Sequence, residues 1–150
     1  MAKSYDICIR GAGLVGRTLA LLLARERFSV ALVNDPSTSD TGHADIRAYA
    51  LNAASHALLE SLRCWPEPEH ATAVLHMHVC GDRGGNVRFD AAAQQVPALA
   101  WIADVPALEA RLAEAVRYQP RVEQVASPVS APLTVVCEGR TSRTREELGV

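Results

Sequence analysis

Gly11, Gly13 and Gly16 have the spacing G-x-G-x-x-G, the pattern in this 150-residue chain that most directly predicts chemistry. They follow the β-branched run Tyr5 to Ile9 and open an apolar stretch with helical spacing, Leu14 to Arg27. In such a turn the first glycine permits a tight bend, the second lets the backbone approach a pyrophosphate, and the third lets the helix lie close to the strand. Free amides at the positive end of the helix then bind the phosphates. The motif therefore predicts a dinucleotide site.

The predicted ligand contacts along this turn are Gly11, Ala12, Gly13, Leu14, Val15 and Gly16. The alternative is a structural strand-turn-helix unit that binds nothing, and the strand before and the helix after the glycines favour the nucleotide site. Asn34 and Asp35 end the second strand, where such folds place a ribose-binding acid. Because neighbouring strand residues point in different directions, either Asn34 or Asp35 is the expected ribose contact.

The elements that position this turn are strands alternating with helices, which predicts an α/β, Rossmann-like three-layer fold with a parallel central sheet. The predicted sheet strands are Tyr5 to Ile9, Ser29 to Val33, Val122 to Val125 and Leu133 to Cys137. Leu133 to Cys137 is expected beside Tyr5 to Ile9. A helix from Pro106 to Val116 carries one apolar stripe with a period of four residues, and a polar, helical segment is expected to end the chain.

Arg47 is a candidate phosphate ligand outside the glycine turn. Pro36 to Asp45 is rich in turn residues and reads as a loop, and Ile46 to Ser55 is expected to lead from it into a helix that continues to Leu62. A guanidinium where a loop meets a helix can bind phosphate oxygens in bidentate fashion. The alternative is an ordinary solvated or salt-bridged surface arginine.

A β-hairpin is predicted from Val74 to Asp90, with the turn Gly81 to Gly85. Alternation along Val74 to Cys80 places His76, His78 and Cys80 on one face. Since no fourth ligand is suitably spaced, we expect a cavity-facing or solvated sheet face and no metal site.

Composition narrows the class of protein. Hydrophobic residues make up 49% and charged residues 21%, which is typical of one globular domain over residues 1–150. A net charge of −2 argues against nucleic-acid binding, and no apolar run is long enough to span a bilayer. The four scattered cysteines form no C-x-x-C pair and suggest buried thiols in a reducing cytoplasm, in preference to disulfides or zinc.

Four segments in a fixed order resemble the class A flavoprotein monooxygenases, in particular the ubiquinone-biosynthesis hydroxylases that act on 2-polyprenyl-6-methoxyphenol. The segments are Asp6 to Gly16, Asp45 to Ser55, Val87 to Ala91 with Trp101 to Leu112, and Leu133 to Arg143. The resemblance implies FAD as cofactor, NAD(P)H as co-substrate and a small aromatic substrate. It also implies that Arg47 contacts FAD, and that Glu138 and Gly139 form the motif that contacts its pyrophosphate.

The chain also departs from this family pattern. Arg10 replaces an apolar residue, Asn34 the ribose-binding acid, Pro106 a cofactor-contacting side chain, and Glu138 the usual aspartate. Arg10 is expected either to pair with Glu138 or to bind the phosphates. The segment between Tyr118 and Leu133 is shorter than in the family.

A second FAD motif and the substrate sheet come later in the family than Val150, so we expect a truncated FAD-binding domain in which no catalytic residue can be named. The leading hypothesis is the FAD-binding portion of an NAD(P)H- and O2-dependent hydroxylase of a polyprenylated phenol or related ring. It would be inactive as this chain alone, cytoplasmic, and with peripheral access to lipid-soluble substrates. The alternatives are a non-catalytic module that binds FAD or another adenine dinucleotide, and a relic that binds nothing.

Overall fold

The computed structural model describes residues 4–34, 45–140 and 142–149, and the chain forms two compact units. One unit consists of residues 1–44 and 109–150, and the other of residues 45–108. The boundary between the units falls within helix α3, Val105–Arg117. None of the described helices is long and apolar enough to cross a membrane.

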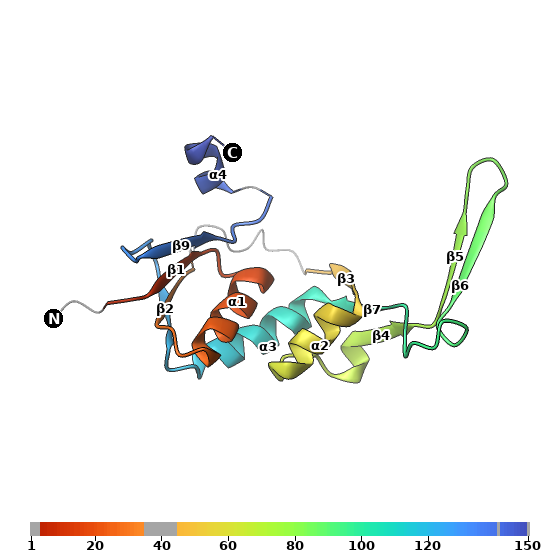
Figure 1. Ribbon diagram of the computed structural model, residues 1–150, viewed down its shortest axis with the longest axis horizontal. Helices are drawn as coiled ribbons and strands as arrows, with labels where there is room; N and C mark the ends of the chain where they lie inside the picture. The colour runs from red at the N-terminus through yellow and green to blue at the C-terminus, as the bar shows by residue number, and fades with distance from the viewer. Residues whose placement is uncertain (1–3, 35–44, 141, 150) are drawn as a thin grey trace. The chain divides into compact units, whose positions relative to one another are not determined.

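The first unit is built on a parallel sheet with the strand order β8-β2-β1-β9. Its strands are β1 (Ile7–Arg10), β2 (Val30–Val33), β8 (Val122–Val125) and β9 (Leu133–Val136). Strands β9, β1 and β2 are labelled in Figure 1. Ile7 pairs with Leu133 in parallel register, which confirms the expected position of the last strand beside the first. The predicted α/β, Rossmann-like fold is confirmed.

The two central strands of this sheet are buried, apart from the partly exposed Arg10 at the end of β1. Ile9 in β1 and Val30, Ala31 and Leu32 in β2 have no exposed surface. Continuous apolar runs are typical of parallel strands that are covered on both faces. On one face lies α1 (Leu14–Arg25), which contacts β1, β2 and β8.

Small residues bring α1 close to the sheet. Its buried positions are Gly16, Ala20, Leu21 and Ala24, so three of the four have little or no side chain. On the same unit the short segment 126–132 joins β8 to β9, although β2 and β1 lie between those strands. Crossovers between parallel strands usually take a dozen or more residues, so this connection is unusually direct.

The second unit contains an antiparallel sheet with the order β3-β7-β4. Its elements are β3 (Ala48–Leu51), α2 (Ala53–Ser61), the 3-10 helix η2 (Pro68–His70), β4 (Ala71–Val74) and β7 (Ala100–Asp104). The prediction that Ile46 to Ser55 runs from loop into helix is wrong in its first half, because β3 pairs there with β7. Alanine has low strand propensity, so Ala48 and Ala50 concealed this strand.

A separate two-stranded sheet is formed by β5 (His76–Cys80) and β6 (Asn86–Asp90). The turn between Gly81 and Gly85 is confirmed by a hydrogen bond from the Gly81 N–H to the Gly85 carbonyl. The predicted continuous strand from Val74 to Cys80 is wrong, because Leu75 separates β4 from β5. The residues before it pair with β7 and those after it pair with β6.

Helices complete both units. In α3 the predicted stripe is confirmed, since Leu108, Leu112 and Val116 are buried. The chain ends in α4 (Arg143–Leu148), as the polar C-terminal segment predicted.

The four cysteines differ in burial, although the sequence suggested that all of them are buried. Cys8 and Cys64 are buried as predicted, whereas Cys137 is half-buried and Cys80 is exposed on β5. The reason is that the hairpin carrying Cys80 has no layer packed over that face within the described residues.

Candidate dinucleotide site

The glycine turn joins β1 to α1, and two of its glycines are required by close backbone contacts. Gly11 has a φ of +109°, and a Cβ there would lie 2.5 Å from the Cys137 carbonyl oxygen. A Cβ on Gly16 would overlap the Gly11 carbonyl oxygen. Both substitutions would force the backbone to move, so these glycines make the turn itself possible.

Gly13 differs from the other two because a Cβ there would meet nothing within 4 Å. It is the residue immediately before α1, and no side chain caps the helix at this position. The first amides of a helix have no acceptor within the helix, and together with the helix dipole they attract an anion. The three glycines therefore differ as predicted: Gly11 and Gly16 permit close backbone packing, and Gly13 leaves open the space where a pyrophosphate would bind. A dinucleotide fits the residues present.

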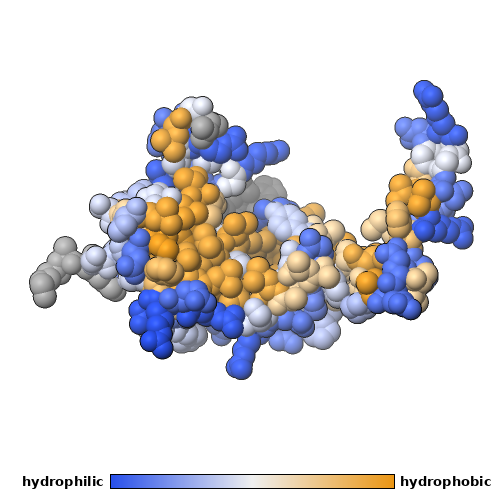
Figure 2. All heavy atoms as spheres, viewed as in Figure 1, coloured by the Kyte–Doolittle hydropathy of each residue, from blue (hydrophilic) through white to orange (hydrophobic). Residues whose placement is uncertain are grey.

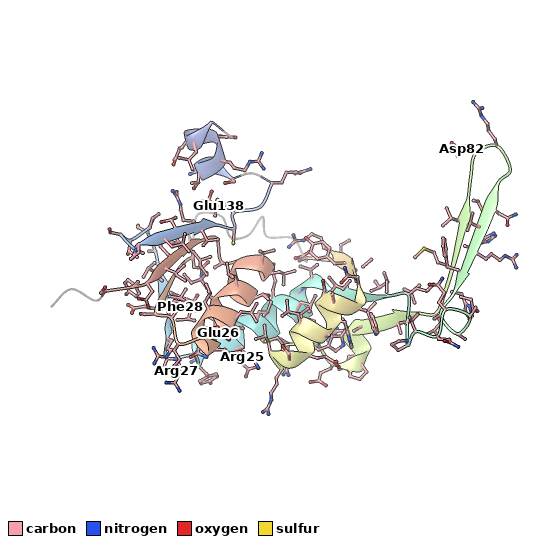
Figure 3. The ribbon with its side chains drawn as sticks, viewed as in Figure 1. Arg25, Glu26, Arg27, Phe28, Asp82 and Glu138 are labelled. Atoms are coloured by element: carbon pink, nitrogen blue, oxygen red, sulfur yellow. The ribbon has the colours of Figure 1, made fainter. Side chains whose placement is uncertain are left out.

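Glu138 lies between β9 and α4 (Figure 3), and its backbone nitrogen is next to Gly11 of the glycine turn. Its Oε2 accepts hydrogen bonds from Ser142 Oγ at 2.7 Å and from the Thr144 N–H at 3.0 Å. Its Oε1 accepts one from Thr144 Oγ1 at 2.7 Å. Both Ser142 and Thr144 are buried. The carboxylate is thus bonded to Ser142 and Thr144, and the cofactor contact expected at Glu138 stays a prediction.

The pKa of Glu138 reflects these partners. Burial acts to raise it, but the hydrogen bonds from Ser142 and Thr144, together with the charge of Arg10, lower the pKa to about 2. Glu138 is therefore an anion at neutral pH. The adjacent Gly139 has a φ of +75° and open space where a Cβ would be, so its backbone is accessible.

Arg10 is the last residue of β1 and directly precedes the glycine turn. Its Nε lies 3.1 Å from Glu138 Oε1, and its Nη1 lies 3.8 Å from the exposed carboxylate of Glu147. This confirms the pairing of Arg10 with Glu138. The buried Nε–H is not aligned with that oxygen, however, and finds no hydrogen-bond acceptor among the described residues. The contact is therefore an ion pair without a hydrogen bond.

Asn34 follows β2, and its side-chain amide donates to Gln124 Oε1 at 3.4 Å. The bond is long and the residue is exposed, so the amide can exchange this partner for a ribose hydroxyl. Asp35, the other candidate for this contact, lies outside the described residues. Which of the two binds a ribose stays a prediction.

Arg47 belongs to the second unit, where it directly precedes β3. Its Nε and Nη2 donate to the two carboxylate oxygens of Asp45, at 2.9 and 2.6 Å. These bonds from Arg47 lower the pKa of Asp45 to about 2. The guanidinium is thus already held in a bidentate pair, and its cofactor contact stays a prediction.

Two residues at the site were missed by sequence reasoning, Ser142 and Thr144. Ser142 is the N-cap of α4, where its Oγ accepts from the Arg145 N–H. A serine before a polar helical segment is a recognisable signal for a helix start. Its link to Glu138 was not visible, because that contact depends on how the intervening turn folds.

The hairpin histidines form pairs and not a metal cluster. His76 Nδ1 lies 2.9 Å from Asp90 Oδ2, and His78 Nε2 lies 3.8 Å from Cys80 Sγ. Within the described residues, no group of three or more histidine, cysteine, aspartate or glutamate side chains is placed to hold a metal ion.

No protein-family model matches the chain. It is 30% identical over 123 residues to 3-demethoxyubiquinol 3-hydroxylase of Escherichia coli, an alignment that covers 78% of this chain and 31% of that enzyme. The structure is similar to that of PqsL, a probable FAD-dependent monooxygenase from Pseudomonas aeruginosa, with a TM-score of 0.75 and 18% identity. The chain therefore resembles the class A flavoprotein monooxygenases in sequence and in fold.

The likeness in fold extends over the whole chain. It covers 99% of this chain and 46% of PqsL. The p-nitrophenol 4-monooxygenase PnpA from Pseudomonas putida is similar with a TM-score of 0.70 and 19% identity, over 99% of this chain and 44% of PnpA. The chain therefore spans less than half the length of these relatives.

Proposed function

We propose that the chain is the FAD-binding portion of a flavin-dependent aromatic hydroxylase. The observation that carries the proposal is the glycine turn, in which Gly11 and Gly16 are fixed by backbone contacts while Gly13 stays open before the uncapped start of α1. The names of the relatives support FAD and an aromatic ring as substrate. A polyprenylated phenol is the substrate class suggested by the E. coli relative.

The residues proposed to hold FAD are mainly backbone groups. Amides of the turn Gly11 to Gly16 and the exposed backbone at Gly139 would bind the pyrophosphate, and Asn34 or Asp35 would bind the ribose. Arg47 would add a charged contact after exchanging Asp45 for the cofactor. When bound, the flavin supplies the redox chemistry with NAD(P)H and O2, and the protein supplies position and electrostatics. The described residues contribute no proposed acid or base.

A non-catalytic module that binds FAD or another adenine dinucleotide is the second candidate. It is supported by the same turn, whose free amides can hold an adenine dinucleotide whether or not a reaction follows. Both candidates predict binding, and only the first predicts turnover in a longer protein that contains this portion.

Calorimetric titration of the purified chain with FAD tests the binding proposal. We expect a micromolar or weaker dissociation constant, because Asn34 and Pro106 replace two charged contacts that each contribute about 1.5–3 kcal/mol. Gly13→Val should abolish binding, since its side chain would fill the open space that the pyrophosphate needs. The matched control is Gly85→Val, because Gly85 is also open and lies in the hairpin turn.

The outcomes separate the candidates. If Gly13→Val bound FAD as well as the parent chain, the turn would be structural and the proposal would fail. If FAD bound but a version extended to the length of the relatives consumed no NAD(P)H with any phenolic substrate, the binding module would be the correct interpretation.

A further inference from the structure

We propose that Glu138 is a positioning residue, whose carboxylate docks α4 beside the carboxyl end of β1 and thereby fixes the backbone that borders the glycine turn. The inference rests on the proposed function only for the identity of the ligand at that turn. The contact expected between Glu138, Gly139 and the pyrophosphate would then be made by their backbone.

The hydrogen bonds of Glu138 carry the first step. An ionised carboxylate only accepts hydrogen bonds, and it has about four lone-pair directions. Ser142 Oγ, the Thr144 N–H and Thr144 Oγ1 occupy three of them, and Arg10 Nε lies 3.1 Å from the same group. Little acceptor capacity is left for a ribose or another donor.

The residues that donate to Glu138 are buried. Ser142 and Thr144 are each only 4% exposed, so water cannot readily replace Glu138 as their partner. A buried donor left without an acceptor is costly. The start of α4 therefore depends on this carboxylate.

The connection to the glycine turn is the third step. The Cys137 N–H donates to the Arg10 carbonyl at 2.7 Å, and the position of a Cβ on Gly11 is 2.9 Å from the Glu138 nitrogen. The peptide of Cys137 and Glu138 is thus packed directly against the turn. Holding Glu138 from the side of α4 restrains this peptide, and Arg10 balances the negative charge that would otherwise oppose a phosphate.

Hydrogen exchange in the ligand-free protein tests the proposal without using FAD. In Glu138→Ala, the amides of Thr144 and Arg145 should exchange at least about tenfold faster than in the parent, because the buried donors lose their acceptor. The matched control is Glu147→Gln, since Glu147 also faces Arg10, whereas Ser142 and Thr144 donate their hydrogen bonds to Glu138. In Glu147→Gln the amides of α4 should exchange at the same rate as in the parent protein.

Two outcomes would overturn the inference. The first is an α4 amide exchange rate in Glu138→Ala that equals the rate in the parent protein, combined with weaker FAD binding. This result would make the carboxylate a cofactor ligand. Equal acceleration in Glu147→Gln would show a general effect of charge. If no variant bound FAD but the exchange results held, only the proposed function would fail.

A pH titration of the parent protein tests the proposal even if the Glu138→Ala variant does not fold. The amide signal of Thr144 in the parent should titrate with Glu138, at a midpoint near its pKa of about 2. Because this pKa is lowered from 4.5, docking of α4 is complete above pH 4.5 and is lost as the pH falls through about 2. A midpoint near 4.5 would contradict the docking. Thr144→Val, which keeps the carboxylate and removes one hydroxyl donor, should accelerate exchange in α4 less than Glu138→Ala.

Discussion

The parallel sheet of the first unit and the β5-β6 hairpin of the second both carry apolar side chains on their strands, yet the environments of these side chains are opposite. In β2, Val30, Ala31 and Leu32 have no exposed surface. In the hairpin, Val79 is 49% exposed and Val87, which pairs with it, is 53% exposed. Figure 2 shows apolar residues in the stem of the hairpin and hydrophilic ones at its tip.

The apolar residues of a strand stabilise a fold only when another layer covers them. Sheet strands β1 and β2 lie between two neighbouring strands and against α1. Strands β5 and β6 have only each other within the described residues. Isolated two-stranded hairpins are marginally stable in water, so we expect the sheet to dominate the stability of the chain.

Gly16→Ala should give the largest loss of stability. Its Cβ would overlap the Gly11 carbonyl, so the start of α1 must move away from the turn, and we expect the free energy of unfolding to fall by about 3 kcal/mol or more. Gly85→Ala in the hairpin turn is the matched control, because a Cβ there meets nothing within 4 Å. Urea denaturation measures both. Equal effects would contradict the comparison.

Leu32→Ala should have the next largest effect. Removing this fully buried side chain from β2 is expected to cost about 2–5 kcal/mol, since it leaves a cavity. Leu75→Ala removes the same atoms from a residue that is 49% exposed, and the change should be about 0.5 kcal/mol. A loss of several kcal/mol at Leu75, which directly precedes β5, would mean that the base of the hairpin is covered in solution.

The smallest expected effect is a difference in thiol labelling rate between Cys80 of the hairpin and the other cysteines. Cys80 on β5 is exposed and should react first with iodoacetamide. Cys137 should be slower, because burial raises the pKa of its thiol and lowers the fraction of thiolate. Cys8 and Cys64 are buried and should react only on unfolding. Mass spectrometry of the labelled peptides gives the order, and early labelling of Cys8 would show that the sheet opens.

The central strands of the parallel sheet and the glycine turn were predictable from the sequence alone. Both are local patterns: Gly11, Gly13 and Gly16 follow an apolar strand directly, and the continuous apolar run of β2 is typical of a strand with two covered faces. These features follow from neighbouring residues, so their prediction needed no knowledge of distant contacts.

Tertiary structure decided the features that depend on partners far apart in sequence. Strand β3 exists because β7 pairs with it, and Leu75 separates two strands because their partners differ. The direction of the Glu138 carboxylate was set in the same way, by the turn that brings Ser142 and Thr144 to it. An alternating pattern or a motif specifies which residues can pair, but only packing determines which partner each one meets.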